Sequence, residues 1–309
     1  FRSASLEKPS FTIIGGDLDH SGPGKRQKDL NAIRQKTRLM HRNNLSQNVM
    51  RRQDLATFIL RKTGIMHQWD DHDFAFNNAN RKYIGKRVAL DVYDEYFPSY
   101  PRPFASNGIF QSWTWGHVQF FLLDGRYNRS PAKDPDTAEK TMLGDVQKSW
   151  LKEELQASTA MWKILISGSV FNPTTKCGAD NWCTYKTEGK ELTDFIREKN
   201  IQNVFIVSGD IHAGAITDGT NSEYNTFWEM AVPGADVVYP GCDTTTFQGP
   251  NKFGEWTHGT WGEGFRIQDP PKTCWGYGKV DVRTNPHRLE LYVKDENGNE
   301  KIHATVPAE

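Results

Sequence analysis

The stretch that decides the fold is IMHQWDDHDFAFNN, residues 65–78, where a short apolar run ends in Asp70, Asp71, His72 and Asp73. The run has the length and the flanking turn residues of a strand that is buried on both faces. Carboxylates at this density repel one another unless they share protons or face a strong cation. We therefore expect these side chains to gather at the carboxyl end of a buried strand, which is where ligand sites lie in open α/β sheets.

The same chemistry recurs at the ends of other apolar runs. Runs that end in glycine, serine or aspartate lie at residues 10–17, 108–124, 162–169 and 203–210. Histidine follows aspartate within three residues at two of these ends, as Asp17 with His20 and as Asp210 with His212. Turn formation and helix capping account for any single aspartate of this kind. They do not account for the repeated pairing with histidine, which favours a dinuclear metal centre whose cations reverse the repulsion among the acids.

The remaining pattern predicts an α/β sandwich, with one or more central sheets and helices outside. Helices are predicted at residues 29–40, 45–62, 144–158 and 189–200. The third should be capped by Asp145. The apolar faces of the third and fourth are, in order, Val146, Trp150, Leu151 and Leu155, and then Leu192, Phe195 and Ile196. Residues 108–124 alternate as a hairpin does, and short alternating runs over about residues 225–309 predict an antiparallel β region.

Length, charge and termini narrow the classes of function. The 309 residues suit one domain over 1–309, with the β region packed as part of it. Lys plus Arg and Asp plus Glu both number 38, which argues against a general nucleic-acid binder. No apolar run approaches the roughly 20 residues that cross a bilayer. The chain opens FRSASLEKPSF without an initiator Met, which is typical of a processed or truncated product. No pattern predicts an oligomeric state.

The four cysteines lie in loop-like sequence. Cys177 and Cys183 bracket CGADNWC, whereas Cys242 and Cys274 lie in Gly- and Pro-rich stretches. An even number confined to loops favours two disulfides over four unrelated thiols, and hence an extracellular, periplasmic or cell-surface protein. The Cys-x2-Cys spacing of structural zinc sites is absent.

Taken together, seven motifs in this order resemble the alkaline phosphatase D (PhoD-like) family of the metallophosphoesterase superfamily. They are FTIIGGDLDHS, HQWDDHDF, FFLLDGRYNR, LGDVQKSWLKEEL, WKILISGS, VFIVSGDIHAG and WEMAVPGAD. The resemblance implies a four-layer α/β/β/α sandwich and a secreted phosphomonoesterase or phosphodiesterase acting on small-molecule or polymeric phosphate esters. It also implies two or more metal ions, with metal-bound hydroxide attacking phosphorus in line with the leaving oxygen.

The resemblance also implies a set of metal ligands. Asp17 matches the carboxylate that bridges both metals, and His20 falls where the family usually has a tyrosine that binds ferric iron. Asp71 stands where the superfamily has an asparagine on the second metal. Asp210 and His212 match the late ligand pair. Imidazole at position 20 suits zinc, manganese or ferrous iron as well as ferric iron, and calcium suits the Asp-rich side.

Other residues would act on the phosphate. His72 matches the histidine that contacts phosphate and assists the leaving group, a role worth roughly 10²–10⁴-fold if it is a general acid. Asp70 or Asp73 would orient His72. Arg126 would contact the phosphate or form a salt bridge with an acid such as Asp124.

Two departures from the family support other functions. The family opens with a strand that carries a metal ligand upstream of the GD motif, and residues 1–11 are too short to contain it. Together with His20, this leaves a catalytically impaired relative with a structural or binding role as the alternative. A calcium-stabilised extracellular binding module, with Asp71 and Asp210 as oxygen ligands, is a third reading.

Other aromatic and histidine residues carry weaker expectations. His117, His258 and His287 lack partners at ligand spacing and are expected to pack or lie at the surface. Trp113, Trp115 and Trp228 are expected in the core. Residues 247–261 are rich in aromatics and glycine and are expected to form a covering loop or a substrate-facing one.

Overall fold

The fold is built around a mixed seven-stranded sheet. The computed structural model describes residues 1–18, 20–45, 54–172, 181–211, 213–222, 224, 227–234, 256–262 and 276–309. In sheet order the strands are β3 (Gln111–Trp115), β4 (Val118–Leu122), β5 (Trp162–Ser167), β6 (Val204–Ser208), β8 (Trp228–Ala231), β7 (Ala213–Thr217) and β9 (Thr260–Gly262). Neighbours from β4 to β8 run parallel, so the loops at their carboxyl ends lie along one edge.

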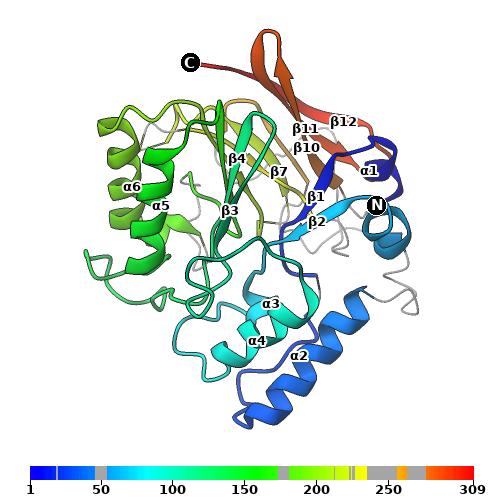
Figure 1. Ribbon diagram of the computed structural model, residues 1–309, viewed down its shortest axis with the longest axis vertical. Coiled ribbons are helices and arrows are strands. Elements are labelled where there is room, and N and C mark those ends of the chain that lie inside the picture. The colour runs from blue at the N-terminus through cyan, green and yellow to red at the C-terminus, as the bar shows by residue number, and fades with distance from the viewer. Residues whose placement is uncertain are drawn as a thin grey trace, which may run out of the picture.

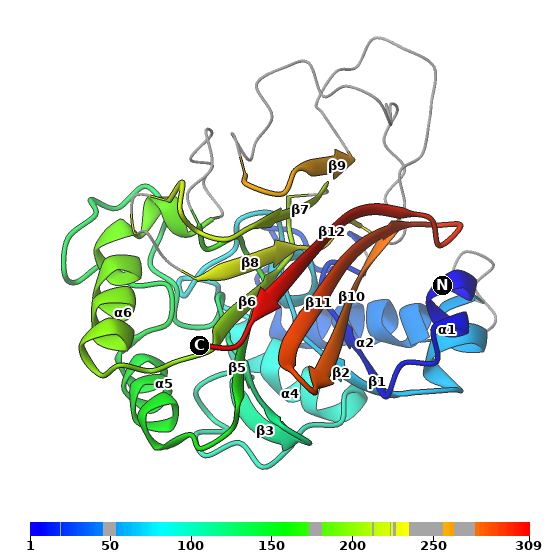
Figure 2. The same ribbon diagram turned by 90° about the horizontal axis from the view of Figure 1, so that it is seen from above.

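Two smaller sheets form a second β-layer against it (Figure 2). Strands β1 (Phe11–Ile14) and β2 (Gly64–His67) pair in parallel. The antiparallel sheet expected near the C-terminus consists of β10 (Gly276–Thr284), β11 (His287–Asp295) and β12 (Glu300–Pro307). Alternate side chains of β11 and β12, such as Leu291 and Val293, pack in one core with side chains of the seven-stranded sheet, such as Phe120 and Phe205.

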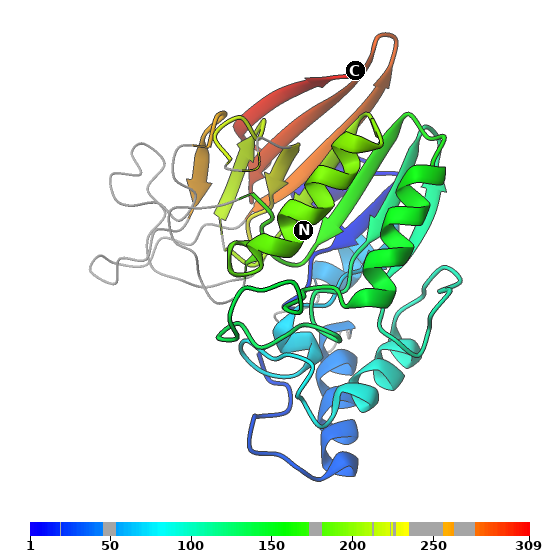
Figure 3. The same ribbon diagram turned by 90° about the vertical axis from the view of Figure 1, so that its left-hand side faces the viewer.

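Helices α5 (Asp145–Ala157) and α6 (Lys186–Glu198) cover the opposite face of the seven-stranded sheet (Figure 3). Their apolar sides pack on Phe121, Leu165 and Ile206. The predicted face of α5 is wrong at one position, because Gln147 is buried and Val146 is 40 % exposed. The reason is that the Gln147 amide has backbone partners inside the molecule, so a polar residue takes the inner position.

The remaining helices lie mostly at one end of the molecule (Figure 1). They are α2 (Leu30–Leu45), α3 (Asp71–Phe74) and α4 (Lys86–Tyr96), with α1 (Arg2–Leu6), a π-helical turn at Leu55–Leu60 and a 3₁₀ turn at Trp182–Thr184 elsewhere. Of the helix predicted at 45–62, the described residues after Leu45 show only the π-helical turn at Leu55–Leu60. No helix in these ranges combines the length and apolarity needed to span a bilayer. The expected α/β class and the antiparallel C-terminal sheet are confirmed.

Candidate metal centre

The site begins where the loops after β1 and β2 meet. Gly16 has a φ of +97°, and a Cβ on it would lie 2.7 Å from the backbone nitrogen of Asp70. Only glycine allows so close an approach, which explains the second glycine of the GGD motif. Asp17 and Asp210 have φ values of 54° and 69°, in the left-handed region that non-glycine residues rarely adopt. Strained backbone of this kind clusters at functional sites.

A buried carboxylate, Asp73, joins the two loops. It accepts the backbone N–H groups of Asp17 at 2.5 Å, Asp70 at 3.0 Å and Leu18 at 3.4 Å. Burial raises the pKa of Asp73 to about 7. The carboxylate therefore faces backbone donors from both loops, and its expected role in orienting His72 stays a prediction.

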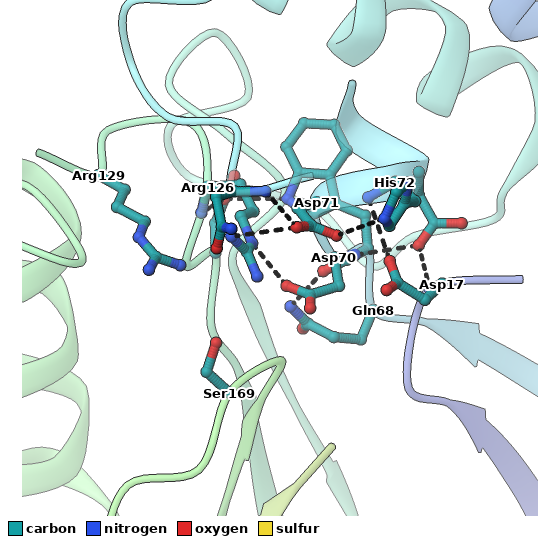
Figure 4. Close-up of polar contacts among 12 residues, drawn as sticks. Asp17, Gln68, Asp70, Asp71, His72, Arg126, Arg129 and Ser169 are labelled. Atoms are coloured by element: carbon teal, nitrogen blue, oxygen red, sulfur yellow. Dashed lines mark hydrogen bonds and ion pairs between the residues drawn. The ribbon is translucent and has the colours of Figure 1, made fainter. Parts of the chain in front are cut away.

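Two groups of possible metal ligands share Asp17, which Figure 4 shows together with Asp70 and His72. One group joins Asp17 with His20 and His72, and the other joins it with Asp70 and Asp210. Within each group the ligand atoms lie within 4.8 Å of one another. The rings of His20 and His72 stack with centroids 3.8 Å apart, and the His20 side chain is 50 % exposed. The shared aspartate is the residue expected to bridge, and the exposed imidazole leaves one side open to solvent.

The electrostatics of the cluster fit a cation. Burial, together with the charges of Asp70, Asp73 and Asp71, raises the pKa of Asp17 to about 10, against the opposing charge of Arg126. Among the residues that the structure describes, Asp71 Oδ1 is buried and has no hydrogen-bond partner. Positive metal ions held by the two ligand groups would reduce the repulsion among these acids.

Arg126 is fully buried beside the acids (Figure 4). Its Nε donates to Asp70 Oδ1 at 2.6 Å, and its Nη1 lies 3.9 Å from Asp71 Oδ2. The acid paired with its side chain is thus Asp70, whereas Asp124 accepts the Arg126 backbone N–H. Its contact with phosphate stays a prediction.

Asp70 and Asp71, which precede His72, have different surroundings that the sequence did not distinguish. Asp71 Oδ1 lies 3.8 Å from His72 Nε2, and its Oδ2 accepts the Asn78 N–H at 2.5 Å. Asp70, expected to orient His72, lies in one of the two groups of possible metal ligands. The sequence feature that could have indicated Asp70 as a possible ligand is its position next to Asp71 in the same motif. The roles of both stay predictions.

Several expectations fall elsewhere. His212, Cys177, Cys242 and Cys274 lie outside the described residues, as do residues 247–255. Cys183 is buried. The pairing of the cysteines stays a prediction.

The other aromatic residues behave mostly as expected. The His117 and His287 rings lie 5.5 Å apart, and His258 lies 4.7 Å from Trp228. Trp113 is buried, but Trp115 is 52 % exposed and was wrongly expected in the core. It lies at the end of the edge strand β3, where the Phe11 ring of β1 contacts it at a centroid distance of 5.8 Å and leaves about half of it exposed.

Known proteins share this sequence and this fold. Residues 17–288 match the family model described as PhoD-like phosphatase. Alkaline phosphatase D of Bacillus subtilis (strain 168) is 28 % identical over 178 residues, which cover 47 % of this chain and 30 % of that protein. The match thus spans less than a third of this curated relative.

Solved structures agree on the fold. The structure of PhoD aligns with a TM-score of 0.63 at 20 % identity, covering 100 % of this chain and 68 % of that one. A purple acid phosphatase from yellow lupin (Lupinus luteus) seeds aligns at 0.54 and 11 % identity, covering 99 % and 48 %. At these identities the likeness establishes a metallophosphoesterase-like fold. With the family model matching most of the chain, this protein belongs to the PhoD-like phosphatase family.

Proposed function

We propose that this chain is a metal-dependent phosphoric ester hydrolase with a dinuclear centre. The observation that carries the proposal is Asp17, which belongs to both ligand groups and lies on strained backbone. In this proposal Asp17 and His20 would hold one metal ion together with His212, the ligand that the family resemblance implies, while His72 of the first group is kept for the phosphate. Asp17, Asp70 and Asp210 would hold the other metal ion. Bound metal ions would supply Lewis acidity to the phosphoryl group and lower the pKa of water.

The chain's own residues would orient the ester and deliver a proton to its leaving oxygen. The backbone N–H of His72 donates to Asp17 Oδ1 at 3.1 Å, which keeps the histidine next to the shared carboxylate. Its Nε2 faces Asp71 Oδ1 at 3.8 Å. We assign His72 to the phosphoryl oxygen or the leaving oxygen, with Asp71 steadying the ring. Arg126 would balance the charge of Asp70 from its buried position.

The proposal extends to the cellular setting and the substrate class. Loop cysteines in an even number support a disulfide-bonded, exported protein. The family supports phosphate monoesters or diesters as substrates. We treat residues 1–309 as one catalytic domain, because both β-layers contribute to a single core.

The test is metal content with matched turnover. Elemental mass spectrometry of natively purified protein should give about two metals per chain. Turnover of p-nitrophenyl phosphate or bis-p-nitrophenyl phosphate should vanish on chelation and return with added metal. A chain that holds no metal and cleaves neither ester would contradict the proposal and favour the catalytically impaired alternative. Faster turnover of the monoester or of the diester would show which class of ester the enzyme prefers.

A further inference from the structure

A fully buried carboxylate, Asp124, lies behind the candidate metal centre and belongs to neither ligand group. It lies two residues after the end of the core strand β4. Its Oδ1 accepts from the Trp69 indole Nε1 and from the backbone nitrogens of Arg126 and Tyr127, each at 2.9 Å. Its Oδ2 accepts from the Ile109 backbone nitrogen at 2.9 Å. One side chain therefore collects donors from three separate segments of the chain.

Two of these donors lead to the ligand group. Trp69 is joined by its peptide bond to Asp70, and the Arg126 side chain donates to Asp70 Oδ1 at 2.6 Å. The contacts close a ring that runs from Asp124 through Trp69 and Asp70 to Arg126 and back. Any shift of Asp124 would therefore move both the carboxylate of the ligand group and the cation paired with it.

Asp124 is itself held on the far side. The side-chain oxygen of Gln147, on α5, accepts the Asp124 backbone N–H at 2.7 Å, and its amide nitrogen donates to the Asp124 carbonyl at 2.9 Å. Gly108 has a φ of +130°, and a Cβ there would overlap the Asp124 carboxylate. Gln147 and Gly108 thus share one function, because the first binds the Asp124 backbone and the second leaves room for the Asp124 carboxylate.

We propose that Asp124 is a positioning residue that sets the metal affinity of the centre through Trp69, Asp70 and Arg126. The inference rests on the proposed function. Groups that orient a metal ligand from behind typically change metal affinity or activity by about 10–100-fold when they are removed. Asp124 has the geometry of such a group, since it never reaches the ligand atoms and fixes their direction instead.

The test is Asp124→Asn in the full chain, with Zn²⁺ and Mn²⁺ as probes. The asparagine keeps the shape, but its NH₂ group must face a backbone N–H. We expect metal affinity, measured by competition with a chromogenic chelator, to fall about 10–100-fold. Circular dichroism and the melting temperature of the metal-free protein should report a folded chain.

The matched control is Glu188→Gln. Glu188 is also buried, and it accepts from Thr141 Oγ1, the Met142 nitrogen at 2.5 Å and the Leu143 nitrogen at 3.3 Å. It receives none of these bonds from the ligand loops. This variant should lose stability and keep wild-type metal affinity. An equal loss of affinity in Glu188→Gln would make the effect merely structural and overturn the inference.

A second variant tests the same inference in case Asp124→Asn does not fold. Trp69→Phe removes the indole donor and leaves the carboxylate, and we expect weaker metal binding in the same direction. The double variant should be no weaker than Asp124→Asn alone, because both changes break one ring. Wild-type affinity in either foldable single variant would overturn the inference. A wild-type protein that binds neither metal would instead overturn the proposed function.

Discussion

At the scale of single residues, the buried carboxylates fall into two kinds according to what faces them. Asp73, Asp124 and Glu229 face N–H and O–H donors. Glu229 accepts from Ser208 Oγ at 2.6 Å and from the backbone of the loop after β5. Asp17 and Asp70 also accept donors, the His72 N–H and the Arg126 Nε respectively, but they lie close to other acids. Burial, together with those neighbouring acids, raises the pKa of Asp17. The first kind joins loops, and the second kind lies among acids whose mutual repulsion a bound cation would relieve.

The role of His72 as a proton donor can be tested with two esters. His72→Gln should lower kcat for phenyl phosphate by about 10²–10⁴-fold. The loss should be smaller for p-nitrophenyl phosphate, because its better leaving group needs less protonation. Metal content should stay near that of the wild type.

The control for this variant is His117→Gln. His117 is exposed in the turn between β3 and β4 and packs near His287, so both rates should be unchanged. An equal fall for the two esters would assign His72 to the phosphoryl oxygen and contradict its role as proton donor. Loss of metal from His72→Gln would reassign it to a metal ligand.

At the scale of elements, a charge cluster holds helix α1 against the C-terminal sheet. Glu7, just after the helix, bonds to Lys294 and lies 2.9 Å from Lys279 Nζ, and the Tyr277 hydroxyl donates to it at 3.2 Å. Burial alone would raise the pKa of Glu7, but hydrogen bonds from Lys294 and Lys279 lower it to about 2. The first and last segments of the chain are thereby joined.

The stability that Glu7 contributes should depend on pH. Because its pKa is lower in the folded chain than its usual 4.5, the contribution is present above that value and is lost as pH falls toward about 2. Glu7→Gln should destabilise the protein by about 1 kcal/mol at pH 7, since the pairs are partly exposed. Urea unfolding from pH 7 to pH 3 would measure the difference.

An exposed acid provides the comparison for Glu7. Glu198→Gln, at the end of α6, should change the free energy of unfolding little at any of these pH values. A Glu7→Gln deficit that stays constant as the pH falls would show that packing, and not charge, anchors α1.

At the scale of the whole molecule, the two β-layers approach closely where a glycine faces a valine. Gly214 lies on β7, and a Cβ on it would overlap the Val293 side chain on β11. Gly214→Ala should therefore destabilise the protein by about 1–3 kcal/mol, as overpacking in a filled core does. Gly24, with nothing within 4 Å of its virtual Cβ, is the matched site, and Gly24→Ala should stay within about 0.5 kcal/mol. Equal urea midpoints for the two variants would contradict this packing.

Much of the fold follows from local pattern. The runs that became β1, β2, β5 and β6 are short, apolar and bounded by turn residues, so the strands and their polar ends could be predicted. For the same reason Asp17, Asp210 and the acids of residues 70–73 could be expected near one another, because ligand sites in α/β folds lie at the carboxyl ends of the strands.

The sequence by itself determined that acids and histidines collect at one edge of an α/β sandwich, because strand periodicity and turn chemistry are local properties. Only the tertiary structure decided that Asp70 joins Asp17 while Asp71 lies beside His72, and that Asp124 supports them from behind. Neighbouring residues with identical side chains differ only in direction. That direction depends on the order of the strands and on donors that come from distant segments, and the linear sequence does not contain those distances.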